Sequence, residues 1–247
     1  MSAEAHQTPV MKNIKAVLFD VDDTLFDRAL AQKAVLELIV KQMPGVFDGL
    51  KPERVLEAYL ESDRVSTERF DAGAPSEGIR DLRNRLFLQL LGLKEDLAAM
   101  ISEMYVRDYP KVKTPVAGAI PLVKKLSRKF RLGVVSNGLS DVQYTKLETM
   151  GLRDLFSCVV LSEEFGIRKP DSKIFHHAVS FLHLQPAECL YVGDSYVNDV
   201  IGAKNAGMQT CWFNPESLKP PDENIKPDFI VNKLEELLVL LEKYEQT

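Results

Sequence analysis

The sequence predicts an α/β fold: a doubly wound parallel sheet whose first strand is followed by an inserted α-helical domain. Three observations support this prediction. The apolar run Ala16–Phe19 has the length of a buried strand and ends in a cluster of acids. Residues 27–109 show helical periodicity and no convincing strand. After residue 114, short apolar runs alternate with helical segments, which is typical of βαβ units.

Residues 27–110 are expected to form the inserted domain, a compact bundle of four helices. Apolar residues recur at three-to-four spacing within each of them. The first helix stops before Pro44, and Pro52 opens the second, because proline suits the first turn of a helix. Residues 71–78 have the composition of a loop. The expected helices are Arg28–Met43, Pro52–Phe70, Ile79–Leu91 and Lys94–Tyr109.

Residues 1–26 and 111–247 are expected to form the domain that carries the sheet. Right-handed crossovers place the C-terminal ends of all its parallel strands at one edge. The strands expected after the insert are Arg131–Ser136, Cys158–Leu161, Cys189–Gly193, Gln209–Phe213 and Phe229–Val231. The helices that connect or follow them are Ile120–Lys129, Asp141–Met150, Ser172–Leu182, Val197–Ala206 and Leu234–Tyr244.

Composition narrows the class of protein. With 247 residues and 45% hydrophobic residues the chain can bury a large core, and its net charge of -5 argues against a nucleic-acid partner. The three cysteines lie in apolar runs without a CxxC spacing, which indicates buried free thiols in a reducing compartment. The polar leader up to Asn13 lacks the apolar core of a signal peptide, and no apolar run approaches the roughly 18 residues of a membrane span. We therefore expect a cytoplasmic protein without a membrane partner.

Polar residues follow three of the expected strands, and a lysine joins them from a loop. Because the ends of these strands meet at one edge, the four clusters are expected to converge. A divalent cation is the natural counter-ion for so many acids, since hard cations prefer oxygen ligands. Read singly, each cluster could instead be a turn, a helix cap or a solvated charge. The clusters are Asp20-Val21-Asp22-Asp23-Thr24, Ser136-Asn137-Gly138, Lys169-Pro170, and Gly193-Asp194-Ser195 with Asn198-Asp199.

In this order and spacing, the four clusters resemble the motifs of the haloacid dehalogenase superfamily, and specifically its phosphatase branch. The resemblance covers the chain from about Lys15 onward. One departure is Asp23, which stands where the family usually has glycine. The resemblance implies a Rossmann-like catalytic core formed by residues 1–26 and 111–247. It also implies that the helical segment 27–110 is the mobile cap of the small helical type.

The resemblance assigns roles to eight of these polar residues. Asp20 would be the nucleophile that forms an aspartyl-phosphate, and Asp22 the acid and base that serves the leaving group and then water. Lys169 would act in catalysis and hold phosphoryl oxygens. Mg²⁺ would be bound by Asp20, the backbone carbonyl of Asp22 and Asp194, with Asp199 orienting these ligands from behind. The residues expected to bind phosphate are Ser136, the amide of Asn137, Lys169 and Thr24, the last bracing the loop rather than reacting.

These roles predict a magnesium-dependent phosphatase for a small phosphorylated metabolite, such as a sugar phosphate or a nucleoside monophosphate, working as a monomer or small homo-oligomer. A phosphomutase of the β-phosphoglucomutase type stays open as an alternative. A 2-haloacid dehalogenase is disfavoured because that branch lacks an acid equivalent to Asp22 and needs no metal. A non-enzymatic binding module is disfavoured because every motif position holds a competent residue. The histidines and the arginines of the helical segment are interpreted as structural or solvated, namely His6, His176, His177, His183, Arg28, Arg64, Arg69 and Arg80.

Overall fold

The computed structural model describes residues 13–74, 78–222 and 224–244. His6, most of the leader and the centre of the expected loop 71–78 lie outside the described residues. The described chain divides into two compact units. One holds residues 13–27, 115–140 and 150–244, and the other holds residues 28–114 and 141–149.

The first unit contains a six-stranded sheet in which every pair of neighbouring strands is parallel. The strand order is β3-β2-β1-β4-β5-β6, so the sheet grows in one direction from β1 to β3 and in the other from β4 to β6. This is the doubly wound α/β arrangement, and it confirms the predicted fold class. The strands are β1 (Ala16–Phe19), β2 (Arg131–Ser136), β3 (Cys158–Leu161), β4 (Cys189–Gly193), β5 (Gln209–Phe213) and β6 (Phe229–Val231), all with the predicted bounds.

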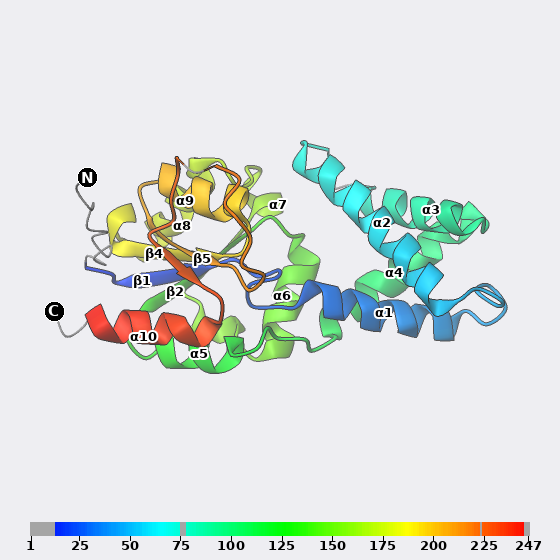
Figure 1. The fold of residues 1–247 in the computed structure, drawn as a ribbon, viewed down its shortest axis with the longest axis horizontal. Helices are drawn as coiled ribbons and strands as arrows, with labels where there is room; N and C mark the ends of the chain where they lie inside the picture. Colours follow the sequence, from blue (N-terminus) through cyan, green and yellow to red (C-terminus); the bar gives the residue numbers. More distant parts are fainter. Residues whose placement is uncertain (1–12, 75–77, 223, 245–247) are drawn as a thin grey trace, which may run out of the picture. The chain divides into compact units, whose positions relative to one another are not determined.

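β1 lies at the centre of the sheet, and all four of its residues are fully buried. It is buried on both faces because helices cover the sheet above and below (Figure 1). α8 (Ser172–Leu182) and α9 (Gly202–Asn205) share a core cluster with β1 and β4 on one face. α5 (Ala119–Leu126) and α10 (Leu234–Tyr244) pack together on the other face. The shorter segments of this unit are α7 (Ser162–Phe165), η3 (Arg153–Leu155), η4 (Pro186–Glu188) and η5 (Tyr196–Ile201).

The helix expected over Val197–Ala206 begins differently from the prediction. η5 is a π-helix, and only its continuation α9 is an α-helix. At this start the Asp199 carboxylate accepts a hydrogen bond from the Ser195 backbone N–H (2.9 Å). The N–H groups of Asp199 and Val200 both donate to the Ser195 carbonyl, the second of them in the wider i→i+5 pattern.

The second unit is helical, and it includes most of α6 (Ser140–Met150). Its aromatic core centres on Phe87, which stacks on Phe47 and meets the ring of Tyr59 edge-on. The segment expected as one helix over Lys94–Tyr109 consists of a 3₁₀ turn, an α-helix and a second 3₁₀ turn. The elements are α1 (Arg28–Gln42), α2 (Pro52–Asp71), α3 (Ile79–Leu91), η1 (Glu95–Leu97), α4 (Ala98–Asp108) and η2 (Tyr109–Lys111).

Candidate active site

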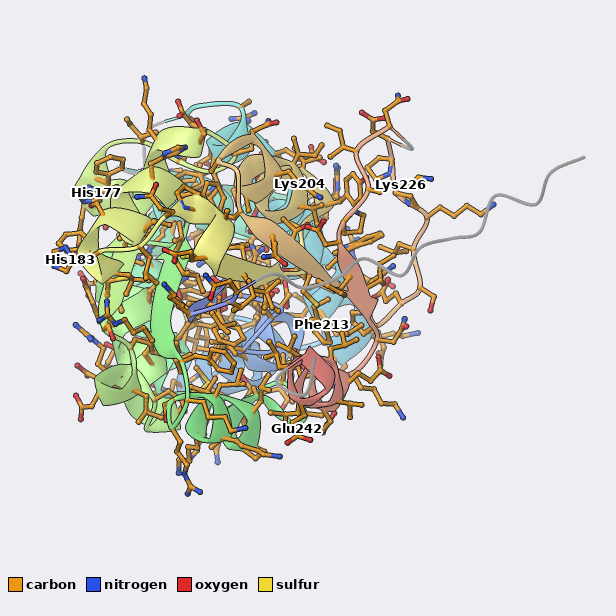
Figure 2. All side chains as sticks on the ribbon, turned by 90° about the vertical axis from the view of Figure 1, so that its left-hand side faces the viewer. His177, His183, Lys204, Phe213, Lys226 and Glu242 are labelled. Carbon is orange, nitrogen blue, oxygen red and sulfur yellow. The ribbon has the colours of Figure 1, made fainter. Side chains whose placement is uncertain are left out.

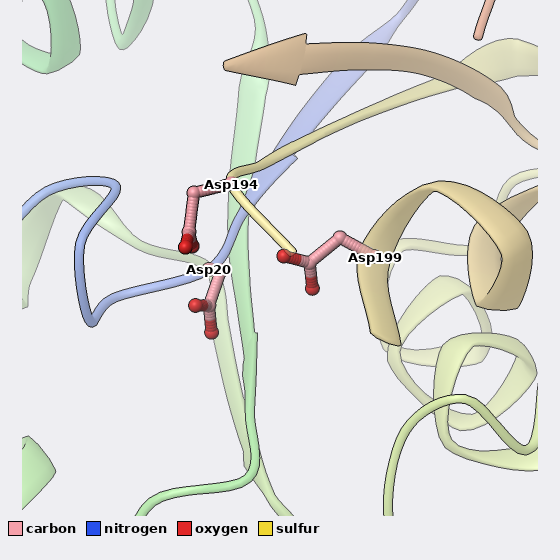
Figure 3. Close-up of side chains that lie close together, drawn as sticks. All are labelled: Asp20, Asp194 and Asp199. Carbon is pink, nitrogen blue, oxygen red and sulfur yellow. The ribbon is translucent and has the colours of Figure 1, made fainter. Parts of the chain in front are cut away.

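The site lies where the strand order of the sheet reverses, between β1 and β4. Ligands of open α/β sheets bind outside the carboxyl ends of the strands at such a point. Asp20 directly follows β1 and Asp194 directly follows β4, and the backbone N–H of Asp20 donates to the carbonyl of Val192 (2.9 Å). Carboxylate oxygens of Asp20, Asp194 and Asp199 lie within 4.8 Å of one another (Figure 3). The sheet thus brings together acids that are far apart in the sequence.

The loop after Asp20 is folded by its own backbone. The N–H groups of Leu25 and Phe26 both donate to the Val21 carbonyl, and the Asp23 N–H donates to the Phe26 carbonyl (2.8 Å). Asp23 has a positive φ of 56°, in the left-handed region that glycine adopts most readily and that aspartate tolerates. This conformation explains why glycine was the residue expected at this position and why Asp23 can stand in its place.

Thr24 is fully buried in the same loop, and its hydroxyl donates to Asp194 Oδ1 (3.1 Å). The hydroxyl therefore joins the first motif to the last and fixes the Asp194 carboxylate. This contact favours the bracing role that was expected of Thr24.

Lys169 is the cation of the site, and only 3% of its side chain is exposed. Its Nζ atom lies 2.8 Å from Asp20 Oδ1, 2.6 Å from Asp199 Oδ1 and 3.1 Å from the hydroxyl oxygen of Tyr191. Burial alone would lower the pKa of Lys169, but the charges of Asp199 and Asp20 raise it well above its ordinary value. Lys169 is therefore a permanent ammonium group in contact with Asp20.

Asn137 holds the backbone of Lys169 with both ends of its side-chain amide. Its Nδ2 donates to the Lys169 carbonyl (3.0 Å), and its Oδ1 accepts from the Lys169 N–H (2.8 Å). Ser136 is buried at the end of β2, and its Oγ accepts from the Gly138 N–H (3.2 Å). The second motif thus fixes the loop that carries the lysine.

Gly193 is required by the position of Asp199. A Cβ atom at residue 193 would lie 2.3 Å from Asp199 Oδ2 and 2.4 Å from its Cγ. With no side chain at Gly193, one oxygen of Asp199 accepts from the Ser195 N–H and the other from Lys169. Asp199 therefore holds the lysine and the loop after β4 in one arrangement.

The carboxylates retain protons more strongly than isolated aspartates. Burial is the main cause that raises the pKa of Asp20 to about 7, with Asp199 and Asp22 adding to the effect and Lys169 opposing it. Burial, followed by the charges of Asp199 and Asp20, raises the pKa of Asp194 to about 8. A divalent cation would compensate this repulsion, and carboxylate oxygens are the ligands that Mg²⁺ prefers. The donor set therefore fits a hard cation.

Two residues of the site were not found from the sequence. Tyr191 lies within the apolar run of β4 and gave no separate signal, yet its hydroxyl contacts Lys169. Trp212 was interpreted as a core residue, and it is buried; its Nε1 also donates to the Asp194 carbonyl (2.7 Å). Both residues lie in strands that are apolar on both faces, so only their tertiary contacts show that they belong to the site.

The histidines and arginines named from the sequence make contacts of their own. His177 and His183 point outward from the α8 side of the first unit (Figure 2), and His177 stacks on Phe165. Within the described residues, the group of acids able to hold a metal includes no histidine. Arg28 forms an ion pair with Asp63, Arg64 with Glu61 and Glu68, and Arg80 with Asp141.

Comparison with known proteins identifies the family of this chain. The profile of the family described as haloacid dehalogenase-like hydrolase matches residues 14–207. The match covers more than half of the chain, so the protein belongs to the haloacid dehalogenase-like hydrolase family. The family resemblance and the expectation of an enzyme are confirmed.

Relatives extend over nearly the whole chain. A glyceraldehyde 3-phosphate phosphatase of Methanopyrus kandleri is 32% identical and covers 91% of this chain and 96% of its own. A phosphoserine phosphatase of Thermus thermophilus is 32% identical and covers 92% and 98%. The structure of the protein YfnB from Bacillus subtilis, which is bound to magnesium, matches with a TM-score of 0.78 at 29% identity and covers 94% of this chain and 100% of its own.

Within the described residues, no helix is both long and apolar enough to span a membrane.

Proposed function

We propose that the protein is a magnesium-dependent phosphatase that hydrolyses a small phosphorylated metabolite through an aspartyl-phosphate on Asp20. The observation that carries this proposal is the contact of Lys169 Nζ with Asp20 Oδ1 (2.8 Å) inside a cluster of carboxylates. Its support also comes from relatives that are named as phosphatases of glyceraldehyde 3-phosphate and phosphoserine. Both names specify small phosphorylated compounds, which is the class of substrate proposed here.

The first step forms a bond between an Asp20 carboxylate oxygen and phosphorus while the bond from phosphorus to the ester oxygen breaks. Asp22, in the partly exposed loop after Asp20, gives its proton to the departing oxygen. Lys169 stabilises the negative charge of the phosphoryl oxygens through its own positive charge, and the Ser136 hydroxyl and the backbone N–H of Asn137 would donate hydrogen bonds to these oxygens. Most of the catalysis would come from this positioning and charge.

In the second step water attacks the phosphorus, Asp22 takes the proton of that water, and Asp20 leaves as a carboxylate. Inorganic phosphate and the original Asp20 result, so the cycle is complete. Asp22 serves as acid in one step and as base in the next because the first step deprotonates it. Thr24 would brace the loop through Asp194 during both steps.

Asp20, Asp194 and the backbone carbonyl of Asp22 would hold Mg²⁺, which when bound supplies positive charge to the carboxylates and to the phosphoryl oxygens. Asp199 would orient the site from behind these ligands, since its two oxygens hold Lys169 and the Ser195 backbone N–H. The raised pKa values of Asp20 and Asp194 support a cation at this place, since a cation would favour their ionised forms.

We further propose that residues 27–110 form a cap that moves relative to the catalytic core. The magnesium-bound YfnB structure is described as revealing interdomain movement. This description supports a similar motion in the present protein, which is 29% identical to YfnB. Such a cap would exclude water while the phosphoryl group is transferred and would release the product afterwards.

Hydrolysis of p-nitrophenyl phosphate, measured with Mg²⁺ and with a chelator, tests the proposal. We expect activity only with Mg²⁺, no turnover by Asp20→Asn, and a loss on the order of 10²–10⁴ in kcat for Asp22→Asn. Asp96→Asn, an exposed acid of η1, is the matched control and should keep the wild-type rate. Equal rates with chelator would remove the metal from the proposal, and normal turnover by Asp20→Asn would remove the nucleophile. Isomerisation of a sugar monophosphate without release of phosphate would identify a phosphomutase instead.

A further inference from the structure

We propose that Tyr191 is a positioning residue of this reaction, which fixes the Lys169 ammonium against Asp20 through its hydroxyl. The inference rests on the proposed function, because it gives Tyr191 a role in the chemistry assigned to Lys169. Tyr191 belongs to none of the sequence motifs and lies in the middle of β4. It is 1% exposed, so it cannot touch solvent or a substrate directly.

The ammonium group of Lys169 has three N–H bonds, and the structure provides three acceptors for them. They are Asp20 Oδ1 at 2.8 Å, Asp199 Oδ1 at 2.6 Å and the Tyr191 hydroxyl at 3.1 Å. Two of these acceptors are carboxylates, which carry charge and attract the ammonium strongly. The Tyr191 hydroxyl is the third acceptor, which is neutral, and it fixes the direction of the third N–H bond of Lys169. All three N–H bonds are thereby satisfied in one orientation.

The direction of the bond between Lys169 and Tyr191 is set by the backbone. The Tyr191 hydroxyl has a single hydrogen, which it donates to the Val135 carbonyl (2.8 Å). Towards Lys169 the hydroxyl therefore acts as an acceptor. Burial raises the pKa of Tyr191 well above its ordinary value, so the phenol keeps this hydrogen at neutral pH.

The phenol reaches across the centre of the sheet. Tyr191 lies in β4 and Val135 in β2, and β1 runs between these two strands. Val135 directly precedes Ser136, which is a proposed phosphate-binding residue. The ring meets Phe175 of α8 edge-on, with 5.0 Å between the centroids, so the ring is held independently of its hydroxyl. Tyr191 thus ties the lysine to the strand that ends in the second motif.

This geometry makes Tyr191→Phe an informative variant. Phenylalanine keeps the ring and its packing on Phe175, but it removes the third acceptor of Lys169 and the donor to Val135. The ammonium is then held by two carboxylates only, and its position against Asp20 is less restricted. Because correctly oriented charge matters most in the transition state, we expect kcat to fall about tenfold while KM stays within about twofold.

Thr210→Val is the matched control. Thr210 pairs with Tyr191 in the sheet register and is equally buried. Its hydroxyl makes two hydrogen bonds with Asp228, and neither involves the proposed site. The control therefore removes a buried hydroxyl from the same rung of the sheet. It should lower the thermal stability and leave kcat unchanged.

A double-mutant cycle with Lys169→Ala tests whether Tyr191 acts through the lysine. Tyr191→Phe should reduce kcat in the wild-type background and should have no further effect once Lys169 is alanine. Where turnover of the Lys169→Ala forms is too slow, the same cycle is measured on binding of aluminium fluoride, a mimic of the phosphoryl group in the transition state. The fluorescence of Trp212, the single tryptophan, reports this binding because its Nε1 contacts the Asp194 carbonyl.

Three results would overturn the inference: an unchanged kcat in Tyr191→Phe, an equal fall in kcat in Thr210→Val, or the same loss in the Lys169→Ala background. Each of them leaves the proposed function intact as long as Asp20→Asn is inactive. Failure of the proposed function is seen separately, as a wild-type protein that hydrolyses no phosphomonoester.

Discussion

The crowding of carboxylates makes a testable prediction about stability: the metal-free protein should become less stable as the pH rises. The pKa of Asp20 is about 7 in the folded protein against 3.8 as its ordinary value. Between these two values the folded state holds a proton that the unfolded state has lost. Stability therefore falls with increasing pH across this window and levels off above about pH 7.

The size of the effect follows from the shift. From 3.8 to about 7 is a difference of roughly 3 units, and each unit corresponds to about 1.36 kcal/mol, so the full window is worth ~4 kcal/mol. Between pH 5 and pH 8.5 about 3 kcal/mol of it should be observed. Solvent screens this effect little, because Asp20 is only 8% exposed. Asp194 acts in the same direction, but the two titrations are coupled and their effects do not add.

Urea unfolding in the presence of a chelator, at a series of pH values from 5 to 8.5, measures this dependence. Asp20→Asn isolates the contribution of Asp20, because the amide has a similar shape and does not titrate. We expect this variant to show a much flatter profile and to be more stable than the wild-type protein at pH 8.5. Asp96→Asn should follow the wild-type profile. Parallel profiles for the wild-type protein and Asp20→Asn would refute the reasoning.

Three further predictions concern the metal, the glycine of the last motif and the helical unit. Mg²⁺ should raise the melting temperature more at pH 8.5 than at pH 5.5, because it binds ionised carboxylates; an equal rise at both pH values would contradict this. Gly193→Ala should lower the unfolding free energy measured in urea by ~1–3 kcal/mol and reduce kcat, because the new Cβ collides with Asp199. Arg83→Leu should cost ~1–3 kcal/mol of unfolding free energy, since it removes one of the two arginine partners of the buried Asp63; a change below about 1 kcal/mol would show that Arg28 alone suffices.

The sequence was sufficient to predict all six strands with their observed bounds, because each is a short apolar run between polar residues. The predicted convergence of Asp20, Lys169 and Asp194 relied on the same regularity, since parallel strands of a doubly wound sheet end at one edge. Asp23 could be noted as a departure from the family, but its reason, a positive φ, needed the backbone.

Local patterns could not predict features that depend on contacts between distant segments. Tyr191 contacts Lys169 from a strand whose sequence is uniformly apolar, so its polar role leaves no periodic signal. The π-helical start of η5 includes the i→i+5 bond from the Val200 N–H to the Ser195 carbonyl, which a helical pattern does not encode. Likewise, the sequence predicted residues 141–149 as a connecting helix of the sheet domain, yet they belong to the same compact unit as residues 28–114. A periodic pattern identifies the buried face of a helix and not the partner that buries it.

The position of the helical insert in the chain explains how the catalytic sheet tolerates it. The insert interrupts only the connection between β1 and β2, which remain direct neighbours in the sheet. Because the entropic cost of closing a connection grows slowly with its length, a segment that buries its own core adds little strain to this pairing. The three strands that carry the motifs, β2, β1 and β4, therefore stay adjacent, and the contacts of Lys169 with Asp20, Asp199 and Tyr191 depend on residues of the sheet unit alone.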